Sequence, residues 1–157
     1  MTKLDQIRDF LAKQGFRPQV RDDYVLFKYE GGTFLLPFDE EDPNFFRIVY
    51  PNFFPFASAG ERQRVLETAA VVTGMVKGVK VFPGVNDTIA SIELLLPDEA
   101  TFQQFFPRAL LSLQEAVRRF VMAMRNVDAE DPVAEAIRLL FRDRRDFDTD
   151  PDHRAAG

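Results

Sequence analysis

The side chains best suited to catalysis are few in this sequence, and none is placed for it. The one histidine, His153, lies in a charged stretch where we expect no packed neighbours to hold its ring in a reactive geometry. The serines Ser58, Ser91 and Ser112 occur outside any nucleophile-elbow pattern and have no ordered histidine as a base. We therefore expect no catalytic residues and no enzymatic activity.

Acidic residues gather at two places in the sequence where a metal site is conceivable. Residues 39–42 read Asp-Glu-Glu-Asp but lack the alternating ligands, central glycine and closing glutamate of a calcium loop, which favours a solvated turn. Residues 142–157 mix aspartates with arginines, as a self-compensating charged segment does. Because the chain also has no cysteine, we expect no metal site and no cofactor.

A basic segment over residues 117–125 raises the question of an acidic partner or RNA. It contains Arg118, Arg119 and Arg125 on a strongly amphipathic stretch, a pattern that is also typical of the solvated face of a helix. The formal net charge of the chain is -5, and affinity for nucleic acid requires cations that neutralise phosphates. A nucleic-acid partner is therefore disfavoured.

Phenylalanine is unusually frequent, with 17 residues and no tryptophan. Pro51 and Pro55 interrupt the stretch that contains Phe53, Phe54 and Phe56, so the sequence predicts a proline-stiffened loop rather than a strand. Rings held in such a loop are good anchors for a partner, because they offer a large contact area with few rotors to freeze. The alternative is that all three rings fold under the loop as a satellite core.

Apolar periodicity and turn residues predict one α+β domain over residues 1–142 and a charged flexible tail over residues 143–157. The expected order is helix, three-stranded antiparallel meander, helix, β-hairpin and long helix, with Pro107 kinking the long helix or starting its main segment. Capping patterns at Thr2 and Asp5 and at Ser58 and Glu61 mark the first two helix starts. A further short helix is expected after Asp131. The expected strands cover residues 24–30, 33–38, 45–50, 79–82 and 88–96.

The cellular setting follows from what the sequence lacks. No apolar run has the length of a signal peptide near residue 1, and none approaches the roughly 20 residues that cross a bilayer. With no cysteine to suggest an oxidising compartment, we expect a cytoplasmic protein without membrane contact.

This order of elements resembles the type III secretion chaperone-like fold, including the YbjN-type bacterial domains, over roughly residues 3 to 125. The features that carry the likeness are Gly15-Phe16-Arg17-Pro18 after the first helix, the hairpin from Asp22 to Asp42 that runs into acid, and a second helix rich in small residues that leads into Val79-Lys80-Val81. The extra helix after Asp131 departs from this pattern.

The resemblance implies a small, non-catalytic, dimeric protein that holds an extended client segment on apolar surface. The client would lie on the sheet beside the first helix and the phenylalanine loop, and the second helix and later hairpin would form the dimer interface. The residues implied for client binding are Leu4, Ile7, Leu11, Phe53, Phe54 and Phe56, and those implied for the dimer interface are Val65, Ala69, Val72, Val76, Val79 and Val81.

A small-molecule sensor is the alternative function. In that case an apolar pocket between the sheet and the long helix would hold the ligand, with Tyr24, Tyr29 or Glu93 as polar contacts.

Overall fold

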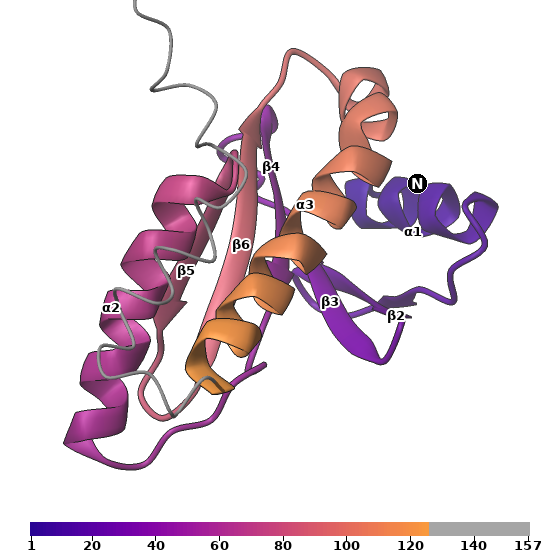
Figure 1. Cartoon of the computed structure of the whole chain (residues 1–157). Helices are drawn as coiled ribbons and strands as arrows, with labels where there is room; N and C mark the ends of the chain where they lie inside the picture. Colours follow the sequence, from indigo (N-terminus) through magenta and orange to yellow (C-terminus); the bar gives the residue numbers. More distant parts are fainter. Residues whose placement is uncertain (126–157) are drawn as a thin grey trace, which may run out of the picture.

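The computed structural model describes residues 1–125, which form three helices and one sheet (Figure 1). The helix expected after Asp131, the expected tail and His153 lie outside the described residues. The elements are α1 (Lys3–Lys13), β1 (Gln19–Val20), β2 (Tyr24–Tyr29), β3 (Gly32–Pro37), β4 (Phe45–Tyr50), α2 (Ala59–Met75), β5 (Val79–Pro83), β6 (Thr88–Leu95) and α3 (Glu99–Arg125). The expected α+β class and element order are confirmed, with the short strand β1 as an addition.

The sheet has six strands in the order β1-β2-β3-β4-β6-β5, and every neighbouring pair is antiparallel. The meander occupies one half of the sheet and the β5–β6 hairpin the other. They join where β4 pairs with β6 along its whole length, from Phe45 opposite Leu95 to Tyr50 opposite Ala90. The sequence does not predict β1, because two residues are too few to show the alternating pattern of a strand.

The turn between β2 and β3 lies one residue earlier than the sequence suggested. Tyr29 pairs with Gly32, so the two turn residues are Glu30 and Gly31, and both have positive φ, at 45° and 79°. This is the backbone of a primed hairpin turn. Gly32 belongs to β3, where a Cβ would lie 2.7 Å from the Tyr50 hydroxyl oxygen.

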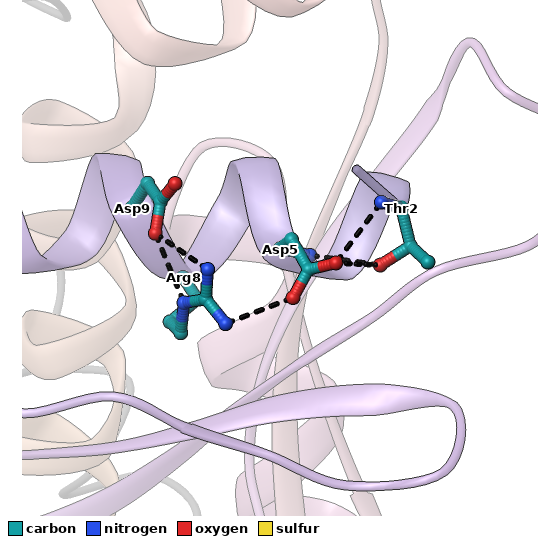
Figure 2. A network of polar contacts seen from close by, with 4 residues as sticks. All are labelled: Thr2, Asp5, Arg8 and Asp9. Atoms are coloured by element: carbon teal, nitrogen blue, oxygen red, sulfur yellow. Dashed lines mark hydrogen bonds and ion pairs between the residues drawn. The ribbon is translucent and has the colours of Figure 1, made fainter.

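Both expected capping boxes are confirmed. At the start of α1 the Thr2 hydroxyl accepts a hydrogen bond from the Asp5 backbone, and the Asp5 carboxylate accepts one from the Thr2 backbone (Figure 2). The hydrogen bond from the Thr2 hydroxyl is the main cause that lowers the pKa of Asp5. Ser58 and Glu61 make the same reciprocal pair at the start of α2. These local contacts fix where the helices begin because they satisfy backbone N–H groups that the helix cannot.

The core lies between one face of the sheet and the helices, with α3 crossing it. Phe102 of α3 stacks on Phe46 of β4 with ring centroids 4.7 Å apart, and Phe106 meets Phe27 of β2 at 6.0 Å. α3 is one helix that continues through Pro107, so this proline does not start the main helical segment. Its buried stripe includes Phe106, whereas the neighbouring Phe105 is exposed.

α2 covers the outer edge of β5. The Thr73 hydroxyl accepts a hydrogen bond from the Val81 backbone N–H at 2.9 Å, so a helix side chain satisfies a group that an edge strand would otherwise expose. At the other end of the helix, the Arg64 guanidinium donates to the Met124 carbonyl at 3.0 Å and ties α2 to the last turn of α3.

Two glycine substitutions should have opposite effects on stability. Gly15 has φ +93° and ends α1, so Gly15→Ala should lower the free energy of unfolding by about 1 kcal/mol. Gly74 lies within α2 with nothing within 4 Å of an added Cβ, so Gly74→Ala should raise it by about 0.5 kcal/mol. Urea unfolding monitored by circular dichroism measures both, and equal effects of the same sign would contradict this interpretation of Gly15.

Candidate functional site

The apolar residues of α1 that were expected to bind a client face the interior of the chain. Ile7 and Leu11 are buried, and Leu4 is half-buried against the core. Their spacing predicts a helix correctly, but these residues lie on the side of α1 that packs on α3 and the sheet. They are not available to a partner in this fold.

The phenylalanine loop is also turned inward. Phe53 and Phe54 both contact Phe120 of α3 edge-on, with centroids 5.4 and 5.5 Å apart, and Phe56 is buried. The loop backbone is held by the start of β6: the Thr88 hydroxyl donates to the Phe54 carbonyl at 2.8 Å. This arrangement matches the satellite-core alternative for these rings.

The residues implied for a dimer interface pack against other residues of the same chain. Five of them are buried between α2, α3 and β5, and the sixth, Val76, is half-buried against the core. A second copy could reach them only if α2 left β5. The burial of these residues therefore argues against a self-association surface at α2 and the β5–β6 hairpin.

An open hollow lies at the edge of the sheet between the end of α1, strand β2 and the middle of α3. Its volume is about 730 Å³. Aromatic and aliphatic side chains form its walls, and exposed cations stand at its rim. The lining residues are Gln14, Gly15, Phe16, Arg17, Gln19, Leu26, Lys28, Tyr29, Glu30, Phe106, Pro107, Leu110 and Leu111.

The segment after α1 builds one wall of this hollow. The Phe16 N–H donates to the Leu11 carbonyl and the Gly15 N–H to the Ala12 carbonyl, which is the hydrogen-bond pattern of a Schellman cap. The cap reverses the chain and brings the Phe16 ring against Phe27 at 4.9 Å and Phe106 at 6.0 Å. The ring therefore belongs to the core, while the backbone of the next residues runs along the rim.

The edge of β2 is unpaired beside the hollow. Tyr29 and Gly32 flank a two-residue turn, so their backbone N–H and C=O groups hydrogen-bond each other. Along β2 from Tyr29, residues that hydrogen-bond β3 alternate with residues whose backbone groups point away from β3. By this alternation the N–H and C=O of Lys28 point away from β3. β1 reaches only as far as Leu26, and no residue of the described range 1–125 outside β3 makes a backbone hydrogen bond to Lys28. One residue of β2 thus offers a free donor and a free acceptor next to an apolar hollow.

The rim of the hollow is positively charged in an acidic protein. The exposed side chains of Arg17 and Lys28 make no hydrogen bond or ion pair with any other residue of the described part. Glu30, on the far side, accepts a hydrogen bond from Gln114 of α3 at 3.2 Å. Its negative charge is the main cause that raises the pKa of Tyr29. The site combines apolar walls, two free cations and a free strand edge.

The sequence did not identify this site, although one signal for it was present. Gly15, Phe16, Arg17 and Pro18 form a sequence motif that follows α1, and Gly15, Phe16 and Arg17 line the hollow. The other lining residues come from β2 and α3, which are far apart in sequence. Only the folded chain brings them together.

The basic segment over residues 117–125 and the acidic turn over residues 39–42 do not form a site in the described residues. On α3, Arg118 and Arg119 both bind the Glu115 carboxylate, at 2.8 and 2.6 Å, so this basic segment is partly neutralised. Within residues 1–125 no three His, Cys, Asp or Glu side chains are grouped to hold a metal ion. None of the three described helices is long and apolar enough to cross a membrane.

Comparison with known structures places the chain in a class of α+β folds in which an antiparallel sheet packs against helices. The particular similarity is to the crystal structure of YbjN from E. coli, a candidate transcription regulator. The TM-score is 0.54 with 12% sequence identity, and the match covers 74% of this chain and 89% of that chain. At this identity the likeness shows a YbjN-like fold alone. No protein-family model matches the sequence. A comparison with curated proteins finds no match either.

The Glu115 cluster predicts a pH-dependent contribution to stability. The hydrogen bond from Arg118 is the main cause that lowers the pKa of Glu115 from 4.5 to about 2. Because the folded-state pKa is depressed, the stabilisation is complete above pH 4.5 and disappears as the pH falls to about 2. The side chain is 36% exposed, so Glu115→Gln should cost less than about 1 kcal/mol at neutral pH.

Urea unfolding at pH 7 and near pH 2 measures this difference. The control is Glu40→Gln, which removes the same charge from the exposed acidic turn. If Glu115→Gln lowers the free energy of unfolding as much near pH 2 as at pH 7, the pH-dependent stabilisation is not due to Glu115.

Proposed function

We propose that this chain is a non-catalytic protein-binding module, chaperone-like or adaptor, that acts as a homodimer and holds an extended segment of a partner protein. The hollow beside the edge of β2 is the binding site. The proposal agrees with what the resemblance to chaperone-like folds implied, but it moves the site from the apolar faces of α1 and the phenylalanine loop to the end of α1.

The observation that carries the proposal is the free N–H and C=O of Lys28 beside the hollow. An extended segment that continues the line of β1 would bond these two groups, as peptides do when they add a strand to a sheet edge. Side chains alternate along such a segment, so one of them would enter the hollow between Phe16, Tyr29 and Phe106. Backbone bonds would give affinity, and the hollow would give specificity.

The rim charges indicate the chemistry of the partner. Arg17 and Lys28 form no ion pair with another residue of the range 1–125, and Glu30, which also lines the hollow, accepts a hydrogen bond from Gln114. A segment with an apolar residue flanked by acidic residues complements both features. Rim charges of this kind mainly raise the association rate and exclude basic competitors.

A small-molecule sensor is favoured by one specific feature of the same hollow. It lies between strand β2 and helix α3, and Tyr29, one of the three polar contacts expected for such a pocket, lines it. The other two do not: Glu93 forms an ion pair with Lys80, and Tyr24 lies at the opposite end of β2. An additional mass in native mass spectrometry that is lost on denaturation would support this function over segment binding.

A peptide-selection experiment tests the proposed function. A displayed library of unstructured peptides is selected for binding to the chain. The selected peptides should be enriched in sequences in which an aromatic or large aliphatic residue is flanked by Asp or Glu. For a selected peptide, Arg17→Glu should weaken binding by about tenfold, since reversing a rim charge replaces a weak attraction by a weak repulsion. Fluorescence anisotropy of the labelled peptide measures the dissociation constant.

Arg125→Glu is the matched control, because it changes the net charge equally at the far end of α3. It should leave the dissociation constant within about twofold. Selection of basic peptides, or equal effects of the two substitutions, would show that the hollow is not the binding site.

A further inference from the structure

A second pocket lies on the other flank of α3, between this helix, strand β6 and the end of α2. Its volume is about 320 Å³, and it shares no lining residue with the hollow. We name it the β6 pocket. Its lining residues are Lys77, Gly78, Ile92, Leu94, Phe105, Arg108, Ala109 and Ser112.

The pocket forms because β6 is longer than the elements that cover it. β5 pairs with β6 only as far as Val79 opposite Ile92, and α2 already ends at Met75. Gly78, with φ +75°, turns the chain from α2 into β5, and a Cβ added there would lie 3.7 Å from the Ile92 side chain. Side chains alternate along β6, so Ile92 and Leu94 lie on the same side and form an apolar floor under α3.

One face of α3 forms the opposite wall. Phe105, Ala109 and Ser112 follow each other at intervals of four and three residues, so they lie on one side of the helix, with Arg108 beside them. Ala109 is buried, whereas the Phe105 side chain is 43% exposed. An exposed ring at the rim of an apolar pocket provides surface that a ligand can cover.

The charged residues that line the β6 pocket are both cations. Lys77 follows the end of α2 and Arg108 lies on α3, so they stand on the two sides of the pocket. Both are exposed, and neither forms an ion pair with another residue of the range 1–125. Glu93 of β6 points to the opposite face of the sheet, where it pairs with Lys80. The pocket is therefore a positive site in a chain of net charge -5.

We propose that the β6 pocket binds a small amphipathic anion, namely a monocarboxylate with an apolar body. Its volume equals that of about ten water molecules at about 30 Å³ each, which suits a ligand of roughly ten non-hydrogen atoms. The carboxylate would meet Lys77 and Arg108, and the Ser112 hydroxyl is a further donor. This site goes beyond the proposed function, because it does not involve the hollow.

The combination of lining residues selects this ligand class over its neighbours. Inorganic phosphate would satisfy the two cations but leave Ile92, Leu94 and Phe105 in contact with water. A neutral hydrocarbon would cover these apolar side chains without using the cations. A carboxylate with an apolar body does both. A ligand of this size should bind with a dissociation constant on the order of 0.1 to 1 mM.

Probes that share one alkyl chain separate charge from apolar contact. Octanoate, 1-octanol and octylammonium differ only in the head group, and inorganic phosphate supplies charge without a chain. In two-dimensional NMR spectra of the full chain, octanoate should shift the amides of Lys77, Gly78 and Ser112 in a saturable way. 1-Octanol should bind about fivefold more weakly, and octylammonium and phosphate more weakly still. Equal affinities for octanoate and octylammonium, or shifts spread over the whole chain, would overturn the proposal.

Neutralising one cation tests what holds the carboxylate. Arg108→Gln should weaken octanoate binding by about fivefold and leave 1-octanol binding within about twofold, because only the charged head group loses a partner. Arg125→Gln is the matched control, since it removes the same charge at the far end of the same helix, and it should leave both affinities unchanged. Equal effects of the two substitutions on octanoate would refute the role of Arg108.

Filling the pocket tests its location. Ser112→Leu places an apolar side chain in the space of the ligand and should weaken binding of both octanoate and 1-octanol by about tenfold or more. Gln104→Leu is the control, because it adds the same side chain at an exposed position of α3 outside the pocket. Circular dichroism confirms that both variants are folded. A folded Ser112→Leu that binds octanoate as tightly as the wild type would overturn the proposal.

The rim variant of the hollow separates the two sites. Arg17→Glu, which should weaken binding of the selected peptide, should bind octanoate as the wild type does. If Arg17→Glu also loses octanoate, the carboxylate binds in the hollow and the β6 pocket is refuted. Octanoate binding that persists in a chain that selects no peptide would refute the hollow and leave the β6 pocket standing.

Discussion

The packing of α3 on the sheet is the interaction on which the rest of the structure depends. Phe102 and Phe106 join the first half of this helix to β4, β2 and α1, and Phe120 joins its second half to the phenylalanine loop. Buried aromatic side chains supply a large part of the apolar area removed from water in a chain of this size. α3 crosses the sheet on the face that carries the buried side chains of β2, β3 and β4.

The same packing creates the hollow. Phe106 is shared by α1, β2 and the segment after α1, so it fixes three elements around one ring. β1 pairs with β2 only as far as Leu26, so the last residues of β2 lie beside the hollow without a partner from β1. The result is a short free edge between fixed walls. A site of this kind binds without a large rearrangement, which lowers the entropic cost of association.

Much of the fold was predictable because its signals are local. The capping boxes at Thr2 and Ser58, the two hairpins and the boundaries of β4 all follow from residues close together in sequence. The candidate site was not predictable in the same way. An apolar stripe has the same pattern whether it faces the core or a partner, so α1 and the phenylalanine loop were assigned to binding although Leu11 and Phe56 are buried. The hollow also depends on contacts between segments far apart in sequence, and the free edge at Lys28 depends on where β1 ends.

The exchange rate of one backbone amide tests the central claim most directly. Without a partner, the N–H of Lys28 should exchange with solvent much faster than those of Phe27 and Tyr29, which face β3. When the selected acidic and apolar peptide is added, exchange at Lys28 should slow, because a new strand then accepts its hydrogen bond. Two-dimensional NMR in deuterated buffer measures all three amides together. A Lys28 amide that is already protected without peptide, or one that exchanges equally fast when the peptide is bound, would contradict the account.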